Sequence, residues 1–317
     1  MKKIVFLLLL CFILNLVKST ITANEPTKIY SNTQEVFIET NGVKLFCRVM
    51  GQGTPVIVIH GGAGLSQDYL LPQMAKLKEH NRVIFYDQRY CGRSTGIIDE
   101  QMVTIETFIN DIEAIRKAFG YEKVSILGHS WGGFLAMNYA ISHSECVEKL
   151  ILLNTSPASS EEWVRFFQEY DHRIKPYEEQ LKAIEKTKEF KDSDPKIMEA
   201  YYRMMFKVYF YDPQKEKDIN LAMSKQAFAN GTKVLEIFAK RLFSQPFNLH
   251  DKLKKINLET LIIHGDYDIV PFVIAQKIHE DISNSKYLLL KNCGHFSYIE
   301  DAEVVFYHLD NFLHPKS

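Results

Sequence analysis

Apolar and polar positions alternate with two different periods along this chain. Two runs of period two, residues 35–40 and 43–49, flank Asn41-Gly42, a residue pair typical of a tight hairpin turn. Further along, largely apolar runs predict strands that are buried on both faces of a sheet. These runs cover residues 55–59, 82–86, 124–127, 149–153, 260–263 and 287–290.

Helical patterns lie between most of these runs. Thr104 begins one of them, with Glu106 in its first turn and apolar residues at helical spacing as far as Phe119. Alternating strands and helices are typical of a parallel sheet that helices cover on both faces. The sequence therefore predicts an α/β fold with a mostly parallel central sheet. The other helical patterns cover residues 134–140, 271–278 and 303–313.

The alternation stops between residues 157 and 247. This stretch holds no strand-like run and is rich in aromatic, lysine and glutamate residues at helical spacing. We interpret it as an inserted helical cap that lies over the edge of the sheet. The core is then made of two parts, residues 24–156 and 248–317.

The first 23 residues differ from the rest of the chain. Met1-Lys2-Lys3 precedes an apolar run at residues 4–14, and Ser19 or Ala23 offers a small residue for cleavage. This pattern is typical of a secretory signal peptide, and the run is shorter than the roughly 20 apolar residues that span a bilayer. Residues 1–23 therefore predict an exported protein that is periplasmic, secreted or held at the surface. The alternative is an uncleaved signal anchor; once the signal is removed, we expect no stable membrane insertion.

Composition and charge narrow the possible partners. Of 317 residues, 46% are hydrophobic and 24% are charged, as in a globular protein with a substantial core. The formal net charge of −1 gives no basic surface for nucleic acid. Four cysteines remain after residue 23, with three possible disulfide pairings, and free buried thiols are the alternative. No two of them have metal-ligand spacing, which argues against a zinc site. For the chain as a whole we expect neither a metal nor an organic cofactor. The four cysteines are Cys47, Cys91, Cys146 and Cys293.

The stretch Gly128-His129-Ser130-Trp131-Gly132 joins the apolar run at 124–127 to a helical pattern. A serine on a sharp strand-to-helix turn is held in a strained conformation, with its hydroxyl exposed above the sheet. Side chains at the two glycines would collide with the neighbouring backbone. The strand before this motif and the helix after it therefore predict a nucleophile at Ser130.

A serine nucleophile needs a base that takes its proton and an acid that orients the base. Asp266 and Asp268 follow the run at 260–263, and His295 follows the run at 287–290. Both loops come at the carboxyl ends of strands, where open parallel sheets place their sites. The order serine, acid, histidine is the one that this kind of fold uses. Asp266 and Asp268 are competing candidates for the acid.

Together these motifs resemble the α/β-hydrolases, and more narrowly the proline iminopeptidase group with its tricorn-interacting aminopeptidase relatives. The group's His-Gly-Gly-Pro-Gly loop matches residues 60–64, with Ala63 in place of proline. Its Tyr-Asp-Gln-Arg-Gly-Cys-Gly-Arg-Ser motif matches residues 86–94, with Tyr90 in place of a glycine. Gly-x-Ser-x-Gly-Gly, Gly-x-x-Asp-x-x-x-Pro and Gly-His also match in this order. The resemblance implies that Ser130 is the nucleophile, Asp268 the acid and His295 the base.

The resemblance also implies an oxyanion hole. The backbone N–H groups of Gly62 and Trp131 would stabilise the negative charge that develops in the transition state. Ala63 is the second choice for the role of Gly62. We interpret His60 and His129 as structural residues beside the site.

The chain departs from the group at the residues that bind substrate. The relatives hold a free α-ammonium with one glutamate directly after the acid and another in the stretch that leads back from the cap. Here Ile269 follows Asp268, and residues 242–247 contain no acid. We therefore expect a largely apolar pocket that prefers a neutral acyl group. Cap glutamates that could replace the missing acids are Glu162, Glu169 and Glu199.

The sequence leaves three functions open. The first is a proline-iminopeptidase-like aminopeptidase, and the second is a carboxylesterase of small neutral acyl substrates. The third is a non-catalytic binding protein on the same fold. The expected partner is a small molecule or a short peptide, and no pattern indicates an oligomeric state or the residues that contact the substrate.

Overall fold

The computed structural model describes residues 33–62 and 64–315. Within them an eight-stranded sheet has the order β1-β2-β4-β3-β5-β6-β7-β8. β2 runs antiparallel to both of its neighbours, and every pairing from β4 to β8 is parallel. The strands are β1 (Gln34–Thr40), β2 (Val43–Met50), β3 (Thr54–Ile59), β4 (Asn81–Tyr86), β5 (Val124–His129), β6 (Val147–Leu153), β7 (Thr260–Gly265) and β8 (Ser285–Leu290).

The first two strands form the predicted hairpin. Asn41 and Gly42 have φ angles of 42° and 77°. Positive φ at both central residues is what a two-residue turn of this kind requires, and Asn-Gly adopts it at little cost. The turn sets the register, with Thr40 opposite Val43.

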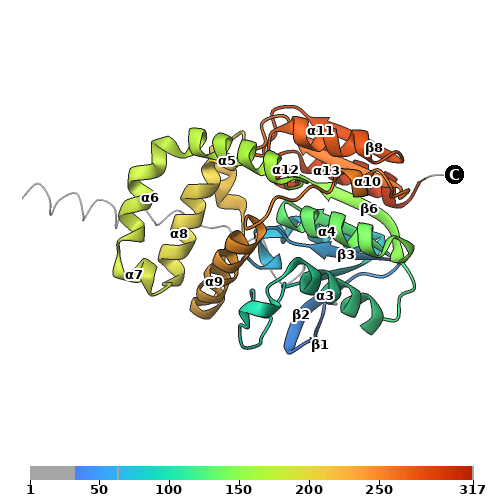
Figure 1. Ribbon diagram of the computed structural model, residues 1–317, viewed down its shortest axis with the longest axis horizontal. Coiled ribbons are helices and arrows are strands. Elements are labelled where there is room, and N and C mark those ends of the chain that lie inside the picture. The colour runs from blue at the N-terminus through green and yellow to red at the C-terminus, as the bar shows by residue number, and fades with distance from the viewer. Residues whose placement is uncertain (1–32, 63, 316–317) are drawn as a thin grey trace, which may run out of the picture. The chain divides into compact units, whose positions relative to one another are not determined.

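Two helices of the core, α3 (Ile105–Ala118) and α4 (Trp131–Ser142), lie side by side (Figure 1). In α3, the Thr104 side chain caps the first turn by accepting a hydrogen bond from the N–H of Thr107. α4 packs against β3, β5 and β6, and nine of its residues are buried. The remaining helices of the core are α10 (His250–Leu253), α11 (Phe272–Asp281), α12 (Ser297–Glu300) and α13 (Ala302–Leu313).

The α-helices between residues 160 and 242 lie together beyond one end of the sheet (Figure 1), and we call this segment, residues 157–247, the cap. No strand is assigned between residues 157 and 247, all of which the structure describes. The chain leaves the core and returns to it side by side, because Ser159 and Asn248 pair in an isolated antiparallel bridge. The cap helices are α5 (Ser160–Ile174), α6 (Glu178–Glu185), α7 (Lys188–Lys191), α8 (Pro195–Phe206) and α9 (Lys225–Leu242).

The apolar runs of the sequence make the core of the sheet. Every residue of β5 and β7 is buried, as are the last four residues of β3. Full burial of an aliphatic side chain contributes about 1.5–3 kcal/mol, so these strands carry much of the stability of the fold. The predicted α/β fold with a mostly parallel sheet is confirmed. The predicted signal peptide, residues 1–23, lies outside the described residues.

The four cysteines of the described residues are free thiols, and three of them are buried. Burial raises the pKa of the Cys91 thiol to about 12 and also raises the pKa of Cys293. Both thiols are therefore protonated at neutral pH, which makes them poor nucleophiles. None of the helices described in residues 33–62 and 64–315 has the length and apolar character needed to cross a membrane.

Candidate active site

Ser130 lies on a sharp turn between β5 and α4. Its φ and ψ angles are 56° and −122°, a conformation that is strained for a residue with a side chain. The flanking glycines are needed for close backbone contacts. A Cβ atom on Gly128 would lie 2.3 Å from the carbonyl oxygen of Gly132, and one on Gly132 would lie 2.1 Å from that of Ile59. The turn leaves Ser130 half-buried while its neighbours His129 and Trp131 are buried.

The predicted acid and base are in direct contact. Nδ1 of His295 lies 2.8 Å from Oδ1 of Asp268, and both side chains are almost fully buried. Because the carboxylate only accepts, Nδ1 carries the hydrogen and Nε2 is left as the basic nitrogen. Asp266 instead faces Lys291, whose Nζ lies 3.5 Å from its carboxylate. Of the two competing aspartates, the structure brings Asp268 to His295.

Asp268 is held by two further donors. The N–H of Val270 donates to Oδ1 at 2.9 Å, and the side-chain amide of Asn154 donates to Oδ2 at 2.8 Å. Burial alone would raise the pKa of Asp268, but the nearby His295 and His264 and the hydrogen bonds from His295 and Val270 lower it well below its usual value. Asp268 is therefore a permanent carboxylate at neutral pH.

Asn154 was not among the predicted site residues. It follows the last residue of β6, so it has the same strand-end position that pointed to Asp268 and His295. Its amide also donates to the carbonyl oxygen of Gly294 at 3.0 Å, and its Oδ1 accepts from the hydroxyl of Ser297 at 2.5 Å. With these bonds, Asn154 joins the loop of Asp268 to the loop of His295.

We call residues 60–62 and 64 the glycine loop, and it lies against Ser130. A Cβ atom on Gly61 would be 2.6 Å from the Cβ atom of Ser130, so only glycine fits there. Nδ1 of His60 donates to the carbonyl oxygen of Gly61 at 2.8 Å, and Nε2 accepts from the N–H of Gln88 at 3.1 Å. These bonds fix the Gly61–Gly62 peptide, in which Gly62 has a φ angle of 56°. Burial lowers the pKa of His60, so its ring is neutral.

The two predicted oxyanion donors belong to different segments of the chain. Gly62 belongs to the glycine loop, and Trp131 is the first residue of α4. The Trp131 ring packs against Phe134 and Phe238, with centroids 5.2 Å and 4.9 Å away. Ala63, the second choice for the Gly62 role, lies outside the described residues.

His129 connects Ser130 to the loop of His295. Its Nε2 lies 3.0 Å from the carbonyl oxygen of His295, and the two rings are 5.0 Å apart between centroids. Burial and the nearby His295 lower the pKa of His129 to about 3, so the ring is neutral. The neighbour of Ser130 is thus bonded to the backbone of His295, and His295 is bonded to Asp268.

The cap contributes polar contacts to this region from two elements. Arg173, in the last turn of α5, donates to the carbonyl oxygens of Tyr267 at 2.7 Å and Asp268 at 3.3 Å. Glu300, in α12, accepts from the N–H of Gly294 at 2.6 Å and from the N–H of Asp212, in the middle of the cap, at 3.0 Å. The cap is therefore bonded to the loops of both the predicted acid and the predicted base.

The cap glutamates that could have replaced the missing acids are engaged elsewhere. Glu162 is buried and bonded to His250, with 3.0 Å between Oε1 and Nε2. Glu169 pairs with Arg173 at 2.6 Å, and Glu199 pairs with Arg203 at 2.7 Å. None of the three carboxylates is left without a partner.

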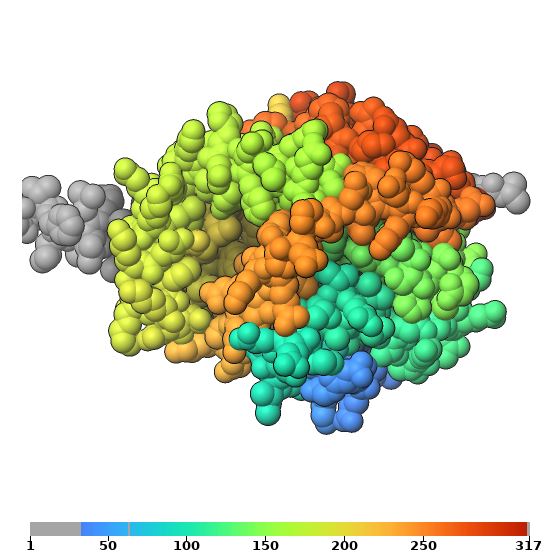
Figure 2. All heavy atoms as spheres, viewed as in Figure 1, coloured from blue at the N-terminus to red at the C-terminus, as the bar shows by residue number. Residues whose placement is uncertain are grey.

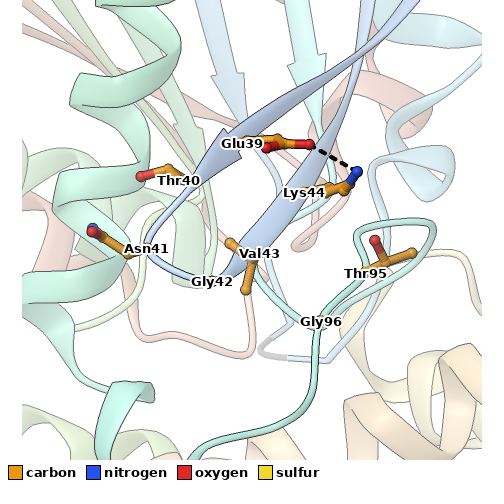
Figure 3. A pocket seen from close by; sticks show the side chains of 8 residues that line it. All are labelled: Glu39, Thr40, Asn41, Gly42, Val43, Lys44, Thr95 and Gly96. Carbon is orange, nitrogen blue, oxygen red and sulfur yellow. Dashed lines mark ion pairs between the residues drawn. The ribbon is translucent and has the colours of Figure 1, made fainter.

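A separate pocket of about 480 Å³ lies at the β1–β2 turn (Figure 3). Its polar side chains include Glu39 and Lys44, an exposed ion pair with 2.8 Å between the charged atoms. It contains none of the predicted site residues. Figure 2 shows another hollow on the surface, between the cap helices α5–α8 in yellow and α9 in orange.

Comparison with known proteins places this geometry in a family. The model of a family described as alpha/beta hydrolase fold matches residues 54–302. The chain belongs to the α/β-hydrolase family. This hydrolase is proline iminopeptidase-like, because curated proline iminopeptidases match most of its length. The resemblance seen in the sequence motifs is thereby confirmed.

Two of these relatives and one solved structure illustrate the match. A proline iminopeptidase of Lactobacillus helveticus is 32% identical over 279 residues, 83% of this chain and 91% of that protein. One from Thermoplasma volcanium is 28% identical over 287 residues, 86% of this chain and 94% of that protein. An alpha/beta fold family hydrolase from Bacillus anthracis superposes with a TM-score of 0.69 at 19% identity, over 88% of this chain and 99% of that chain. The last match concerns the fold alone.

Proposed function

We propose that this hydrolase cleaves an amide or ester bond through an acyl-serine intermediate. Ser130 is the nucleophile, His295 the general base and Asp268 the acid that orients His295. The observation that carries the proposal is the 2.8 Å hydrogen bond between Nδ1 of His295 and Asp268, which leaves Nε2 free to act as a base. The strained turn at Ser130 supports it, because this conformation exposes the hydroxyl.

The reaction proceeds in two halves. His295 takes the proton of Ser130 as Oγ bonds to the carbonyl carbon, and one electron pair of the C=O bond moves onto the oxygen. That oxyanion is stabilised by the N–H groups of Gly62 and Trp131. The pair then returns, the bond to the leaving group breaks, and His295 protonates the departing amine or alcohol. Water repeats the sequence on the acyl-serine and releases the acid.

The first candidate substrate is a short peptide whose N-terminal residue is released. It is supported by relatives named proline iminopeptidase, one of which matches over 91% of its own length. The second candidate is an ester or amide with a neutral acyl group. It is favoured by the ion-paired cap glutamates and by Ile269, which is fully buried at the position where the relatives have a glutamate.

The test compares wild-type protein with Ser130→Ala on two chromogenic substrates, prolyl-p-nitroanilide and p-nitrophenyl butyrate. Serine-dependent release from the anilide supports the aminopeptidase, and an N-acylated prolyl anilide should then be a poor substrate. Serine-dependent cleavage of the ester alone supports the esterase. Activity that survives in Ser130→Ala, or a Ser130 that a fluorophosphonate fails to label, contradicts the mechanism and favours a non-catalytic binding protein.

Export through residues 1–23 is also part of this proposal. The signal pattern at the N-terminus supports it, and sequencing the N-terminus of protein recovered from its native host tests it. A chain that begins directly after Ser19 or Ala23 agrees with cleavage by a signal peptidase. A chain that begins at Met1 contradicts cleavage and favours the signal anchor.

A further inference from the structure

The phenol of Tyr69 lies between the glycine loop and His129. Tyr69 belongs to the 3-10 helix η1 (Gln67–Leu70), which begins three residues after Gly64, and is 3% exposed. Its oxygen accepts a hydrogen bond of 2.5 Å from the N–H of Gly61 and lies 2.6 Å from Nδ1 of His129. The proposed mechanism uses neither Tyr69 nor His129.

The donors and acceptors in this arrangement have a single consistent assignment. The carbonyl oxygen of His295 only accepts, so Nε2 of His129, 3.0 Å away, carries the hydrogen. Nδ1 of His129 is then a lone pair that accepts from the hydroxyl of Tyr69. The oxygen of Tyr69 in turn accepts from Gly61. A continuous chain of hydrogen bonds therefore runs from the glycine loop through Tyr69 and His129 to the backbone of His295.

Packing constrains the two side chains of this hydrogen-bond chain, Tyr69 and His129. The His129 ring lies 5.5 Å from the ring of Tyr69 and 5.4 Å from the ring of Tyr298, measured between centroids. The hydroxyl of Tyr298 donates to the backbone oxygen of Tyr69 at 3.0 Å. His129 is 1% exposed, and its low pKa keeps it neutral, which preserves the lone pair on Nδ1. Both side chains are thus locked by packing as well as by hydrogen bonds.

We infer that Tyr69 and His129 are positioning residues that hold the glycine loop and the loop of His295 at a fixed separation across Ser130. The inference rests on the proposed function, in which the glycine loop supplies an oxyanion donor and His295 supplies the base. The oxyanion donor and the base act at the same carbonyl group of the substrate. A small displacement of either group lowers the rate by a large factor. Because the oxyanion forms only in the transition state, the effect falls on kcat and not on KM.

The experiment compares Tyr69→Phe with Tyr139→Phe on the substrate that the wild type hydrolyses. Tyr139 is a matched control, since it is also fully buried and its hydroxyl donates to Glu113 at 2.9 Å, away from the site. We expect Tyr69→Phe to lower kcat by about tenfold or more with KM within about twofold. Tyr139→Phe should keep both constants within about twofold of the wild type, whatever its thermal stability.

A second readout separates positioning from a loss of packing. An oxyanion hole is shaped for oxygen, so an ester is hydrolysed faster than the matched thionoester, whose sulfur fits poorly. If the glycine loop is displaced, it discriminates less between the oxygen of the ester and the sulfur of the thionoester. The ester-to-thionoester ratio of kcat/KM should therefore fall in Tyr69→Phe but not in Tyr139→Phe. Structural loosening elsewhere lowers both rates together and leaves the ratio unchanged.

His129→Asn and the double variant complete the test and serve if Tyr69→Phe does not fold. The inference predicts that His129→Asn lowers kcat with a similar loss of ester preference, and that the double variant is no slower than the slower single one. The inference is overturned if Tyr69→Phe keeps the wild-type kcat and the wild-type ester-to-thionoester ratio; if only His129→Asn folds, the same result in that variant overturns it. It is also overturned if the losses in kcat of the two single variants add fully in the double variant. A Ser130→Ala protein that remains active would instead overturn the proposed function.

Discussion

The backbone oxygen of Tyr209, in the cap, accepts a hydrogen bond of 2.7 Å from the backbone N–H of His295. The two rings also meet edge to face, with 5.3 Å between their centroids. The proposed base is therefore held from the cap side as well as from the core. Because this contact joins backbone to backbone, the position of the cap sets the position of the base.

Gly294→Ala tests this contact. A Cβ atom at residue 294 would lie 2.3 Å from the backbone oxygen of Tyr209 and 2.9 Å from the Cα atom of Phe210, so the loop of His295 must move away from the cap. We expect kcat to fall by about tenfold or more, since a displacement of about 1 Å in a catalytic group costs up to about 100-fold. Steady-state kinetics measure this, and an unchanged kcat would show that the loop is not set by the cap.

Gly231→Ala tests the contact between the cap and the glycine loop. Gly231 lies within α9, and a Cβ atom there would be 2.0 Å from the backbone oxygen of Gly64. Alanine is favoured over glycine in a helix by about 0.8–1 kcal/mol, so without this contact the substitution would stabilise the protein. We expect the opposite sign: a lower midpoint in thermal unfolding and a lower kcat. A stabilised, fully active variant would contradict the contact.

Asn154→Ala removes a donor from the carboxylate of Asp268. An unsatisfied buried partner costs about 1–3 kcal/mol, and urea unfolding should show a loss of this size. We also expect kcat to fall by about tenfold, because in the proposed mechanism His295 is oriented through Asp268. Asn154→Asp is the matched variant: it fills the same volume but places a second carboxylate beside Asp268, and we expect it to lower kcat at least as much. Wild-type activity in Asn154→Asp would show that volume matters and the donated hydrogen bond does not.

His250 lies where the chain returns from the cap and is bonded on both sides. Nε2 faces Glu162 of the first cap helix at 3.0 Å, and Nδ1 faces Asp281 of α11 at 2.5 Å. Asp281 is also paired with Lys277 at 2.9 Å and lies 4.0 Å from Lys254. The hydrogen bond to Glu162, together with the charges of Glu162 and Asp281, raises the pKa of His250 above its ordinary 6.5.

This pKa shift has a defined consequence for stability. The folded state binds the proton more tightly than the unfolded state, so the contribution of His250 is complete below about pH 6.5 and is lost as the pH rises through the higher, folded-state pKa. We expect His250→Ala to lower the free energy of unfolding by about 2 kcal/mol at pH 6, and the difference from wild type to shrink at alkaline pH. Lys254→Ala is the control: the Lys254 side chain is half exposed and its Nζ lies 4.0 Å from Asp281, so this variant should show little change.

Urea unfolding of the three proteins between pH 5 and about pH 9 measures this dependence. A difference between wild type and His250→Ala that stays constant with pH would contradict a charged His250 in the folded state.

The sequence by itself determined the strands and the turn at Ser130. The apolar runs at residues 55–59 and 124–127 became buried strands. A strand without polar positions has apolar side chains on both faces of the sheet, so helices must cover both faces to keep these side chains from water. The hairpin at Asn41-Gly42 is equally local, since its positive φ angles belong to those two residues. Ser130, Asp268 and His295 could be named because strand ends are visible as the ends of apolar runs.

Only the tertiary structure decided how these loops are joined. Tyr69 and His129 are 60 residues apart, and His129 and the backbone oxygen of His295 are 166 apart, yet each pair shares a hydrogen bond. Asn154 bonds to Asp268 across 114 residues. Hydrogen bonds between distant segments leave no periodic signal, because they depend on where strands and helices place a side chain and not on the residues beside it. The pattern of apolar positions therefore specifies the sheet, and the packing of its loops and cap specifies the site.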